Sequence, residues 1–588
     1  MSRGVRSNRK LTATSKTVVA LLRARAGEMG PKTAFIYLDG RGAGQSMTYG
    51  ELETRARTIG ARLSRQVNRG ERILLAYPSG LEFVEAFFGC LYAGVLPVPA
   101  YLPHPFLLKR AFPRLKAIIR DSRPALGLST QASIQMLKNL TSAEPKALDW
   151  AATDTIDSDG YRDFKGLKLE SDSPAILQYS SGTSSKPRGV LLSHANVLCN
   201  SRHICRLLRH SPNTTIVNWL PHSHDMGLIT TALVCLQTGG LGVLLSTIAF
   251  LKEPALWLEA LSRYKGSSSP APNFAYELCV RRTTPAQRAR LDLSRWSAAL
   301  NGAEPVRAET LERFCRAFRA HGFRRNAFYP CYGLAEATLM VTGGKLLAGP
   351  VLLGLDRQAM ERGRVQLRPL KDKRACVLVG CGRPLPAHRV LIVDPDSRRR
   401  CGPQRIGEIW VSGPSVGFGY WNQPNETERT FHARLKDHPR RRFLRTGDLG
   451  FMKEGQLFVT GRSKDMIIIN GEKHYPEDLE RTAQESSPMI RPSGCAAFSV
   501  PGEGTERLVL VVEAELSKVR RSHPAMKKTK PIASQIREIV ERAIWTHHLI
   551  SAEVRVLRPG GLPRTTSGKV QRNVCRSEFL AHRLDFLP

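Results

Sequence analysis

The chain has 588 residues, with 88 Lys and Arg against 51 Asp and Glu, and a formal net charge of +37. This length exceeds what one hydrophobic core supports and predicts at least two domains. An excess of positive charge is typical of proteins that bind nucleic acid, anionic membranes or acidic partners. The basic clusters carry no zinc-finger, helix-turn-helix or aromatic-platform pattern, so we expect a generally basic surface and no nucleic-acid partner.

The twelve cysteines form no CxxC pair, and none has His or Cys partners at zinc-binding spacing. The basic N-terminus lacks the apolar run of a signal peptide, and the apolar stretch 241–251 is too short to cross a bilayer. We therefore expect a cytoplasmic protein without an integral membrane segment. We also expect it to be a monomer.

The first half of the chain predicts alternating strands and helices. The apolar run 73–75 predicts a strand, 81–93 a helix, and 94–99 a second strand ended by prolines. This β-α-β order implies a parallel sheet. Residues 307–320 predict another helix, because their apolar side chains recur at the spacing of a core-facing stripe.

The predicted secondary-structure pattern changes twice along the second half of the chain. Short strands and turns between about 388 and 461 predict a small β-rich subdomain, and a mixed α/β pattern resumes after it. The expected fold class is therefore α/β. We expect a large N-terminal domain of parallel-rich sheets with helices over 1–463, which includes the β-rich subdomain. A small α+β C-terminal domain is expected over 464–588.

The stretch 179–189 reads Tyr-Ser-Ser-Gly-Thr-Ser-Ser-Lys-Pro-Arg-Gly and follows an apolar run that predicts a buried strand. Hydroxyls and backbone N–H groups donate to phosphate oxygens, and Gly182 allows the backbone to approach closely. Lys186 and Arg188 would offset the charge of a polyphosphate. The stretch does not match the Walker loop, and on its own it is equally well explained as a solvated Ser/Thr-rich loop.

Four further stretches have unusual polar content beside apolar runs. Residues 219–227 place two histidines and an aspartate in a turn, and 301–305 form a turn before the predicted helix. Residues 332–338 offer a tyrosine on which a purine can stack and a glutamate suited to a divalent cation on a nucleotide. Residues 445–448 place an aspartate where it can accept two ribose hydroxyls. Each stretch alone is also explained by ordinary turn chemistry.

Together and in this order, the five stretches resemble the adenylate-forming superfamily of acyl-CoA synthetases, luciferases and peptide-synthetase adenylation domains. The resemblance covers about residues 20–580 and is nearest to the fatty acyl-AMP ligase branch, as 74–101, 272–276 and 474–476 also indicate. It implies a ligase that activates a fatty acid with ATP and Mg²⁺ to acyl-AMP and pyrophosphate. The acyl group would then pass to the phosphopantetheine thiol of an acyl carrier protein, in polyketide or lipopeptide assembly.

The resemblance also implies roles for individual residues. It makes Lys569 and His224 catalytic residues, with His224 beside the acyl carboxylate, and Glu336 the Mg²⁺ carboxylate. Lys464 would be the hinge about which a mobile C-terminal domain turns. The other implied positions are Asn273 and Phe274 in the substrate pocket, Ser181, Gly182, Thr183 and Lys186 at the phosphates, Asn301, Gly302, Ala303, Glu304, Tyr332 and Gly333 at the adenine, and Asp448 and Arg462 at the ribose.

The link between Thr338 and Gly382 is longer than CoA-forming relatives usually have. Its residues 349–373 carry spaced apolar side chains and resemble the insertion that marks fatty acyl-AMP ligases. The alternative is a surface loop peculiar to this lineage. An acyl-CoA synthetase is the alternative function, and a non-catalytic nucleotide- or nucleic-acid-binding protein is an outside alternative.

Overall fold

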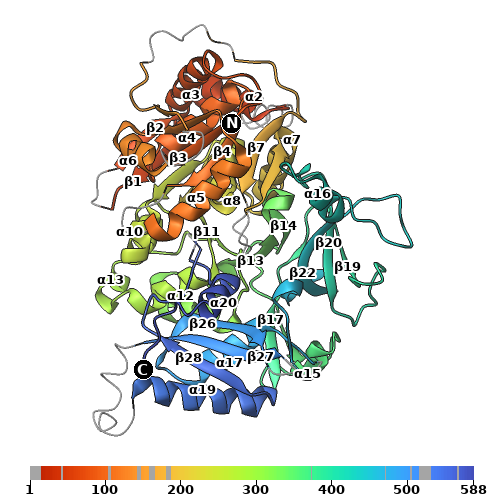
Figure 1. Ribbon diagram of the computed structural model, residues 1–588. Helices are drawn as coiled ribbons and strands as arrows, with labels where there is room; N and C mark the ends of the chain where they lie inside the picture. Colours follow the sequence, from red (N-terminus) through yellow and green to blue (C-terminus); the bar gives the residue numbers. More distant parts are fainter. Residues whose placement is uncertain are drawn as a thin grey trace.

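The computed structural model describes residues 15–40, 44–102, 108–141, 148–157, 164, 166–179, 187–372, 374–469, 472–502, 506–515, 531–565 and 568–588. Figure 1 shows the N-terminal part of the chain in the upper half and the C-terminal part in the lower half. The predicted phosphate-loop residues Ser181, Gly182, Thr183 and Lys186 lie outside the described residues. No described helix combines the length and apolarity that crossing a membrane requires.

The β-α-β unit expected near the N-terminus is confirmed. β3 (Arg72–Tyr77) and β4 (Leu96–Tyr101) pair in parallel, and α4 (Glu82–Tyr92) connects them. α4 buries Phe87 and Phe88 in the apolar core that also holds Ile73 of β3, so hydrophobic burial drives its packing on the sheet. The sheet order is β4-β3-β5-β6, and its other strands are β5 (Leu126–Ser129) and β6 (Trp150–Ala152).

A nine-stranded sheet in the order β18-β14-β13-β12-β11-β9-β10-β1-β2 forms the centre of the molecule. The strands from β13 to β1 pair in parallel, and antiparallel strands close the two edges. Because parallel strands end at the same edge of a sheet, the segments that follow β9, β11, β12 and β13 come together there. The strands are β1 (Thr33–Leu38), β2 (Gly44–Thr48), β9 (Thr215–Asn218), β10 (Leu241–Leu245), β11 (Ser268–Ala271), β12 (Ala298–Asn301), β13 (Phe328–Gly333), β14 (Met340–Gly343) and β18 (Arg383–Pro384).

The helix predicted over 307–320 is α14 (Ala308–Phe318), and it buries Leu311, Phe314 and Phe318 on one face. The spacing of these apolar residues is therefore a core-facing stripe, as expected. The other N-terminal helices are α2 (Val18–Met29), α3 (Tyr49–Ser64), α5 (Leu108–Ser122), α6 (Gln131–Thr141), α7 (His194–Leu207), α8 (Asp225–Gly227), the π-helix η3 (Leu228–Leu233), α9 (Val234–Thr238), α10 (Thr247–Lys252), α11 (Ala255–Arg263), α12 (Asn273–Arg282), α13 (Pro285–Ala289), η4 (Arg319–His321), η5 (Arg325–Ala327) and η6 (Ala335–Ala337).

The β-rich subdomain is an antiparallel sheet in the order β19-β20-β22-β23. The register of its last hairpin sets Asp448 opposite Arg462, so two predicted nucleotide contacts lie side by side. A separate antiparallel sheet, β21-β8-β7, pairs one strand from this part of the chain with two strands from the first half. The elements are β7 (Pro174–Tyr179), β8 (Gly189–Ser193), β19 (Arg389–Val393), β20 (Gly407–Ser412), β21 (Gly419–Tyr420), α16 (Pro424–Phe431), β22 (Leu444–Lys453) and β23 (Gln456–Arg462).

Residues from 467 onward form two apolar clusters of their own, on the two sides of the sheet β26-β27-β28. A large α/β N-terminal part and a smaller α+β C-terminal part are thus present, which confirms the expected fold class. The division at 463/464 and the mobility of the C-terminal domain stay predictions. The C-terminal elements are η7 (Ser463–Asp465), β24 (Ile467–Ile469), β25 (Glu472–His474), α17 (Pro476–Ser486), β26 (Ile490–Pro501), β27 (Glu506–Ala514), α19 (Ile532–His548), β28 (Ala552–Leu557) and α20 (Arg572–Leu580).

The described part of the insertion is folded. It forms β15 (Leu352–Asp356), α15 (Arg357–Glu361) and β16 (Leu367–Arg368), and β15 also pairs with β17 (Ala375–Val379). Its apolar side chains pack with residues of the β-rich subdomain and with one aromatic residue of the C-terminal part. The buried members of this cluster are Leu355, Met360, Cys376, Phe451, Phe458 and Tyr475.

Candidate active site

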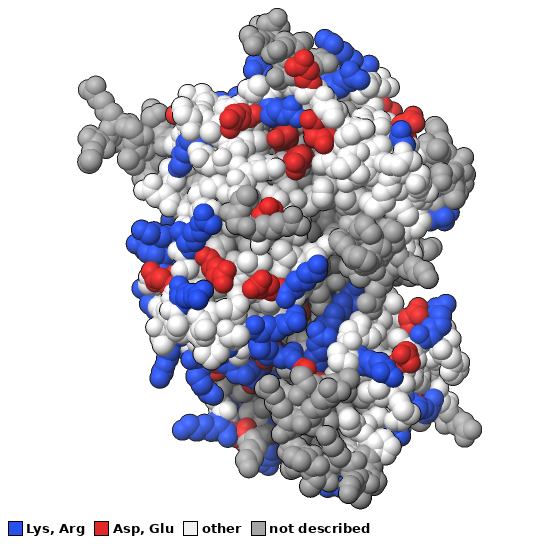
Figure 2. All heavy atoms as spheres, turned by 90° about the vertical axis from the view of Figure 1, so that its left-hand side faces the viewer, with Lys and Arg blue, Asp and Glu red and all other residues white. Residues whose placement is uncertain are grey.

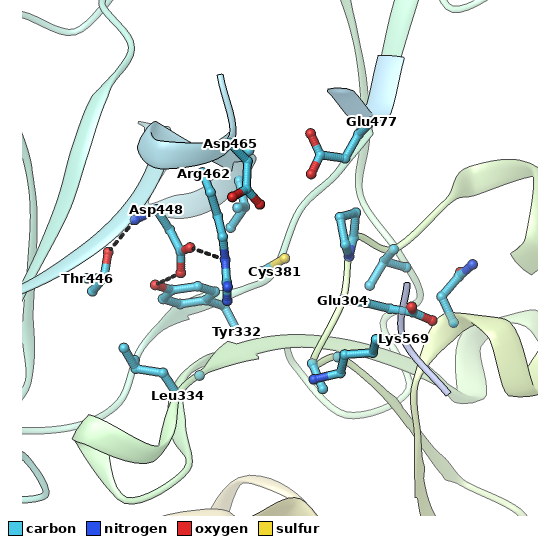
Figure 3. A pocket seen from close by; sticks show the side chains of 18 of the residues that line it. Glu304, Tyr332, Leu334, Cys381, Thr446, Asp448, Arg462, Asp465, Glu477 and Lys569 are labelled. Carbon is cyan, nitrogen blue, oxygen red and sulfur yellow. Dashed lines mark hydrogen bonds and ion pairs between the residues drawn. The ribbon is translucent and has the colours of Figure 1, made fainter. Parts of the chain in front are cut away.

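A cavity of about 700 Å³ lies where the carboxyl edge of the nine-stranded sheet meets the β22–β23 hairpin and the C-terminal domain (Figure 3). Its position follows from the topology, since the loops after parallel strands converge at one edge. Most of the predicted site residues that the structure describes line this cavity. They are His224, Asn273, Gly302, Ala303, Glu304, Tyr332, Gly333, Glu336, Asp448, Arg462, Lys464 and Lys569.

Tyr332, Asp448 and Arg462 form one hydrogen-bonded group on one side of the cavity (Figure 3). The Tyr332 hydroxyl donates to Asp448 Oδ2 over 2.7 Å, and Arg462 Nε donates to Oδ1 over 3.1 Å. Two donors from different elements therefore hold the Asp448 carboxylate in one orientation. At Gly333 a Cβ atom would lie only 1.7 Å from the Leu339 carbonyl oxygen, so only glycine allows the chain to follow this path.

Sequence analysis missed Glu408, which fixes the turn that carries Asp448. Its carboxylate is buried, pairs with Arg445 Nη2 at 2.7 Å and accepts the Gly447 N–H at 3.2 Å. A single glutamate in an otherwise apolar strand gives no signal of this role. Only the pairing of β20 with β22 brings it to the turn.

Glu336 lies at the cavity with a partner that sequence analysis also missed. The Tyr420 hydroxyl donates to Glu336 Oε1 over 2.8 Å, and the Arg188 guanidinium lies 5.2 Å from the centre of the Tyr420 ring. Burial raises the pKa of the Glu336 carboxyl above its usual range, so a bound cation would favour its ionised form. The adjacent aromatic residues Tyr420 and Trp421 after Gly419 are the only local hint in the sequence.

The turn after β12 is joined to α12 by side-chain hydrogen bonds. Glu304 Oε1 accepts the Phe274 N–H at 2.6 Å, and Asn273 Oδ1 accepts the Arg307 N–H at 3.1 Å. Asn301 is fully buried beneath the turn, and both of its side-chain polar atoms lack a hydrogen-bond partner among the described residues. Asn301 does not line the cavity, in contrast to its neighbours Gly302, Ala303 and Glu304.

Phe274 does not line the cavity, in contrast to the pocket role implied for it. It packs against Gly568 of the C-terminal domain, where a Cβ atom would lie 2.5 Å from the Phe274 ring. Gly568 also has φ +87°, a conformation that favours glycine. The phenyl ring therefore supports the loop that carries the neighbouring lysine.

The loop around Lys569 is a tight turn that the C-terminal domain holds in place. The Thr565 N–H donates to the Lys569 carbonyl at 2.7 Å, and the Lys569 N–H donates to Thr565 Oγ1 at 3.1 Å. Arg564 anchors the turn, since it pairs with Glu513 at 3.2 Å and donates to the Gly568 carbonyl at 3.1 Å. The Lys569 side chain consequently reaches the cavity from a fixed base.

Lys569 places a positive charge among carboxylates of the N-terminal domain, and Figure 3 shows its side chain beside Glu304. Burial lowers the pKa of the Lys569 ammonium, and the charges of Asp225 and Glu304 oppose this shift. Burial alone would raise the pKa of Asp225. The charge and hydrogen bond of His224, and then the charge of Lys569, outweigh burial and keep this pKa below its usual range. Asp225 is therefore a site residue that sequence analysis left without a role.

His224 stands at the start of α8 and faces the cavity. Its Nδ1 lies 2.7 Å from Asp225 Oδ1, and the Met226 N–H donates to the same oxygen at 2.7 Å. Its Nε2 is buried and has no hydrogen-bond partner among the described residues. Lys464 lines the cavity from η7, between the last strand of the β-rich subdomain and the first strand of the C-terminal domain.

Comparison with known proteins decides the family. Residues 22–421 match the model of the AMP-binding enzymes, and residues 464–587 match the model of the Disco-interacting protein 2-like AMP domain. The chain belongs to the AMP-binding enzymes, in their fatty acyl-AMP ligase branch. This ligase is 43% identical to the medium-chain-fatty-acid–[acyl-carrier-protein] ligase JamA of Moorena producens, over 97% of this chain and 96% of that protein.

Two further relatives cover almost the whole ligase. The putative fatty-acid–CoA ligase fadD21 of Mycobacterium bovis is 36% identical over 96% of this chain and 98% of that protein. The crystal structure of the fatty acid AMP ligase from Legionella pneumophila is 36% identical, covers 98% of both chains and has a TM-score of 0.75. The resemblance read from the sequence is therefore confirmed at the level of the branch, whereas the roles of individual residues stay predictions.

The charges around Lys569 predict how the rate of adenylation depends on pH. Adenylation that needs the ammonium form should fall as the pH rises through the pKa of Lys569, which burial has lowered. In the variant Asp225→Asn an opposing negative charge is lost, so this pKa should drop further and the fall in kcat/KM should occur at lower pH.

The pH profile of kcat/KM for adenylation, measured in wild type and variant, checks this expectation. Asp372→Asn is the control, because this partly exposed carboxylate pairs with Arg368 of the insertion and does not line the cavity, and it should leave the profile unchanged. An Asp225→Asn profile with its alkaline limb at the wild-type pH or higher would contradict the assignment of the limb to Lys569.

Proposed function

We propose that this ligase joins a fatty acid to ATP, forming acyl-AMP and pyrophosphate, and then transfers the acyl group to the phosphopantetheine thiol of an acyl carrier protein. The observation that carries the proposal is that Lys569, Glu336 and the Tyr332–Asp448 pair line one and the same cavity. The branch of the family, and a relative named as a carrier-protein ligase, support the same reaction.

Within the proposed reaction, the nucleotide lies between the sheet edge and the β22–β23 hairpin. Tyr332 and the turn 301–304 are assigned to the adenine, and Asp448 with Arg462 to the ribose hydroxyls. Gly302, Ala303 and Glu304 line the cavity together with Tyr332, which supports an adenine there. The phosphates are assigned to Ser181, Gly182, Thr183 and Lys186, outside the described residues.

Mg²⁺ is assigned to Glu336. The carboxylate fits a hard cation, because it lines the cavity and its hydrogen bond with Tyr420 engages only Oε1. When bound, Mg²⁺ would supply positive charge at the phosphates of ATP.

The central difficulty of the reaction is that a carboxylate must approach an α-phosphate, and both are anions. A fixed ammonium at the meeting point offsets this repulsion and stabilises the charge that develops in the transition state. Lys569 is assigned this role. His224 is assigned to the fatty-acid carboxylate, and its unpartnered buried Nε2 supports a polar ligand on that side.

In the second half-reaction the phosphopantetheine thiol of the carrier protein has to reach the acyl carbonyl. In the arrangement described here, Lys569 occupies that position. We propose that the domains 1–463 and 464–588 rotate relative to each other between the two half-reactions, with Lys464 as the hinge. Support comes from the separate apolar clusters of the C-terminal residues and from the family model that begins at residue 464. Mobile elements of this kind commonly gate multistep reactions.

An acyl-CoA synthetase is the second candidate, because one relative bears a fatty-acid–CoA ligase name. An ATP–pyrophosphate exchange screen over fatty acids of different chain lengths tests the first half-reaction. Identification of the product with CoA and with a carrier protein then separates the two candidates. Absence of exchange with every fatty acid would contradict both.

Replacement of Lys569 by alanine should reduce ATP–pyrophosphate exchange by at least about 10²–10³-fold, as expected on removal of one donor to a developing charge. ATP binding, measured by calorimetry, should change little, because the adenine and ribose contacts remain. Lys345→Ala, which removes an exposed lysine, is the matched control. Exchange near the wild-type rate in Lys569→Ala would contradict the assigned role.

The insertion 349–373 is assigned the role of preventing CoA from acting as the acyl acceptor. Arg357 of α15 pairs with Asp478 of the C-terminal domain at 3.0 Å, and Glu361 accepts a hydrogen bond from His474 at 3.0 Å. A folded element with such contacts on the C-terminal domain can obstruct the rearrangement that CoA needs. The alternative is that a CoA-binding pocket is missing and the insertion has no part in it.

Replacement of residues 349–373 by a few Gly and Ser residues distinguishes these two explanations. If the insertion obstructs, the shortened enzyme should still adenylate and should release appreciable acyl-CoA, measured by mass spectrometry. Adenylation at the wild-type rate without any acyl-CoA would refute obstruction. Circular dichroism and the melting temperature control for folding.

The basic surface of the ligase is assigned the role of binding the acyl carrier protein. Figure 2 shows Lys and Arg side chains gathered around a hollow in the lower half of one face. Carrier proteins are commonly acidic around the pantetheine serine, and complementary charge raises association rates in a salt-dependent way.

Acyl transfer at limiting carrier protein should therefore fall about tenfold or more from low to moderate salt, while adenylation falls little. Transfer rates that do not change with salt would remove this assignment.

A further inference from the structure

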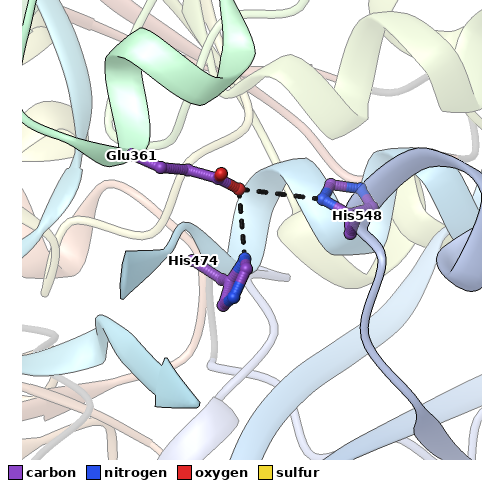
Figure 4. A group of neighbouring side chains, drawn as sticks. All are labelled: Glu361, His474 and His548. Carbon is purple, nitrogen blue, oxygen red and sulfur yellow. Dashed lines mark hydrogen bonds and ion pairs between the residues drawn. The ribbon is translucent and has the colours of Figure 1, made fainter. Parts of the chain in front are cut away.

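Three side chains outside the nucleotide cavity converge where the insertion meets the C-terminal domain (Figure 4). Glu361 ends α15 of the insertion, His474 ends β25, and His548 ends α19. Glu361 Oε1 lies 3.0 Å from His474 Nδ1 and 4.0 Å from His548 Nδ1. The three potential ligand atoms all lie within 4.8 Å of one another.

This cluster is shielded from solvent. The side chains of His474 and His548 are each 1% exposed, and that of Glu361 is 15% exposed. His548 Nδ1 is buried, faces Glu361 and has no hydrogen-bond partner among the described residues. A buried nitrogen without a partner is costly unless something else satisfies it.

We propose that Glu361, His474 and His548 bind one divalent transition-metal ion, with Zn²⁺ as the ion best suited. Two imidazoles and one carboxylate are ligands that zinc prefers, whereas Mg²⁺ and Ca²⁺ prefer oxygen alone. A tetrahedral ion with bonds of about 2.1 Å separates its ligand atoms by about 3.4 Å. The observed separations bracket this value, so small side-chain movements complete the site and leave a fourth position for water.

The surroundings of His548 are compatible with a metal on Nδ1. Such a ligand carries its proton on Nε2, and Thr482 Oγ1 lies 2.8 Å from Nε2 as the acceptor. Arg357 Nη1 also lies 3.2 Å from Nε2, and a guanidinium can only donate, so Arg357 has to shift when Nε2 carries the proton. Its positive charge also opposes metal binding. Its ion pair with Asp478 at 3.0 Å offsets that charge.

The ion would act as a clasp, because its ligands come from both sides of the domain boundary. Glu361 belongs to the insertion, whereas both histidines belong to the C-terminal domain. The site is therefore complete only in the arrangement seen here, and a ligand that binds one arrangement shifts the equilibrium toward it. Metal at about 100 times its dissociation constant would favour this arrangement by about 100-fold.

Metal binding is tested on the full-length enzyme, without affinity tag, fatty acid or ATP. After removal of metal by chelator, the protein is titrated with ZnCl₂ against a chromophoric indicator. One equivalent should bind, and Co²⁺ should give the absorption spectrum of a tetrahedral site. Glu361→Gln and His548→Gln should each weaken zinc binding by at least about tenfold.

His547→Gln is the matched control, because His547 precedes His548 on the same helix and is exposed. It should bind zinc as the wild type does. Equal binding by the wild type, Glu361→Gln and His548→Gln, or no stoichiometric binding by the wild type, would overturn the proposal. Glu361→Gln is isosteric and retains a hydrogen-bond acceptor for His474, so it tests the site even if His548→Gln fails to fold.

A second measurement concerns the clasp itself and rests on the proposed function. In the wild type, Zn²⁺ should slow acyl transfer more than adenylation, and Glu361→Gln should lose this difference. Equal inhibition of wild type and variant would overturn the clasp. Because the binding titration needs no substrate, failure of the proposed reaction and failure of the metal site give distinguishable results.

Discussion

The attraction between the partly buried ammonium of Lys569 and carboxylates across the cavity is the interaction that joins the two sides of the candidate site. A lysine removed from water is unfavourable unless opposite charges surround it, and here those charges, Asp225 and Glu304, belong to the N-terminal domain. The lysine itself belongs to a turn that Arg564 and Glu513 fix to the C-terminal domain. The charged site is thus complete only when both domains adopt this arrangement, and the same charges favour that arrangement.

The nine-stranded sheet explains why the N-terminal side of the site lies where it does. His224, the turn 301–304 and Tyr332 each follow or end a parallel strand, and such strands finish at one edge. The β22–β23 hairpin then supplies Asp448 and Arg462 opposite that edge. Side chains distant in the sequence are therefore brought together by strand order, and no local motif has to encode the whole site.

Several elements could be predicted from the sequence because their signals are local. The β3-α4-β4 unit and α14 follow from apolar runs and helical spacing, and the insertion packs through the apolar side chains that marked it. Most of the described residues predicted through family resemblance line one cavity, and their roles stay predictions. Glu408, Tyr420 and the role of Asp225 were not predicted, because each depends on a partner distant in the chain. Phe274 does not line this cavity and its ring lies against Gly568, so its role in the substrate pocket stays a prediction.

The central claim is that Lys569 serves adenylation and that its domain must turn away before transfer. The direct test supplies chemically prepared acyl-AMP to the Lys569→Ala variant and measures acyl transfer to carrier protein in a single turnover. Because the lysine is not needed after the adenylate exists, transfer should proceed near the wild-type rate although the variant cannot make acyl-AMP itself. Loss of transfer as severe as the loss of adenylation would contradict the account.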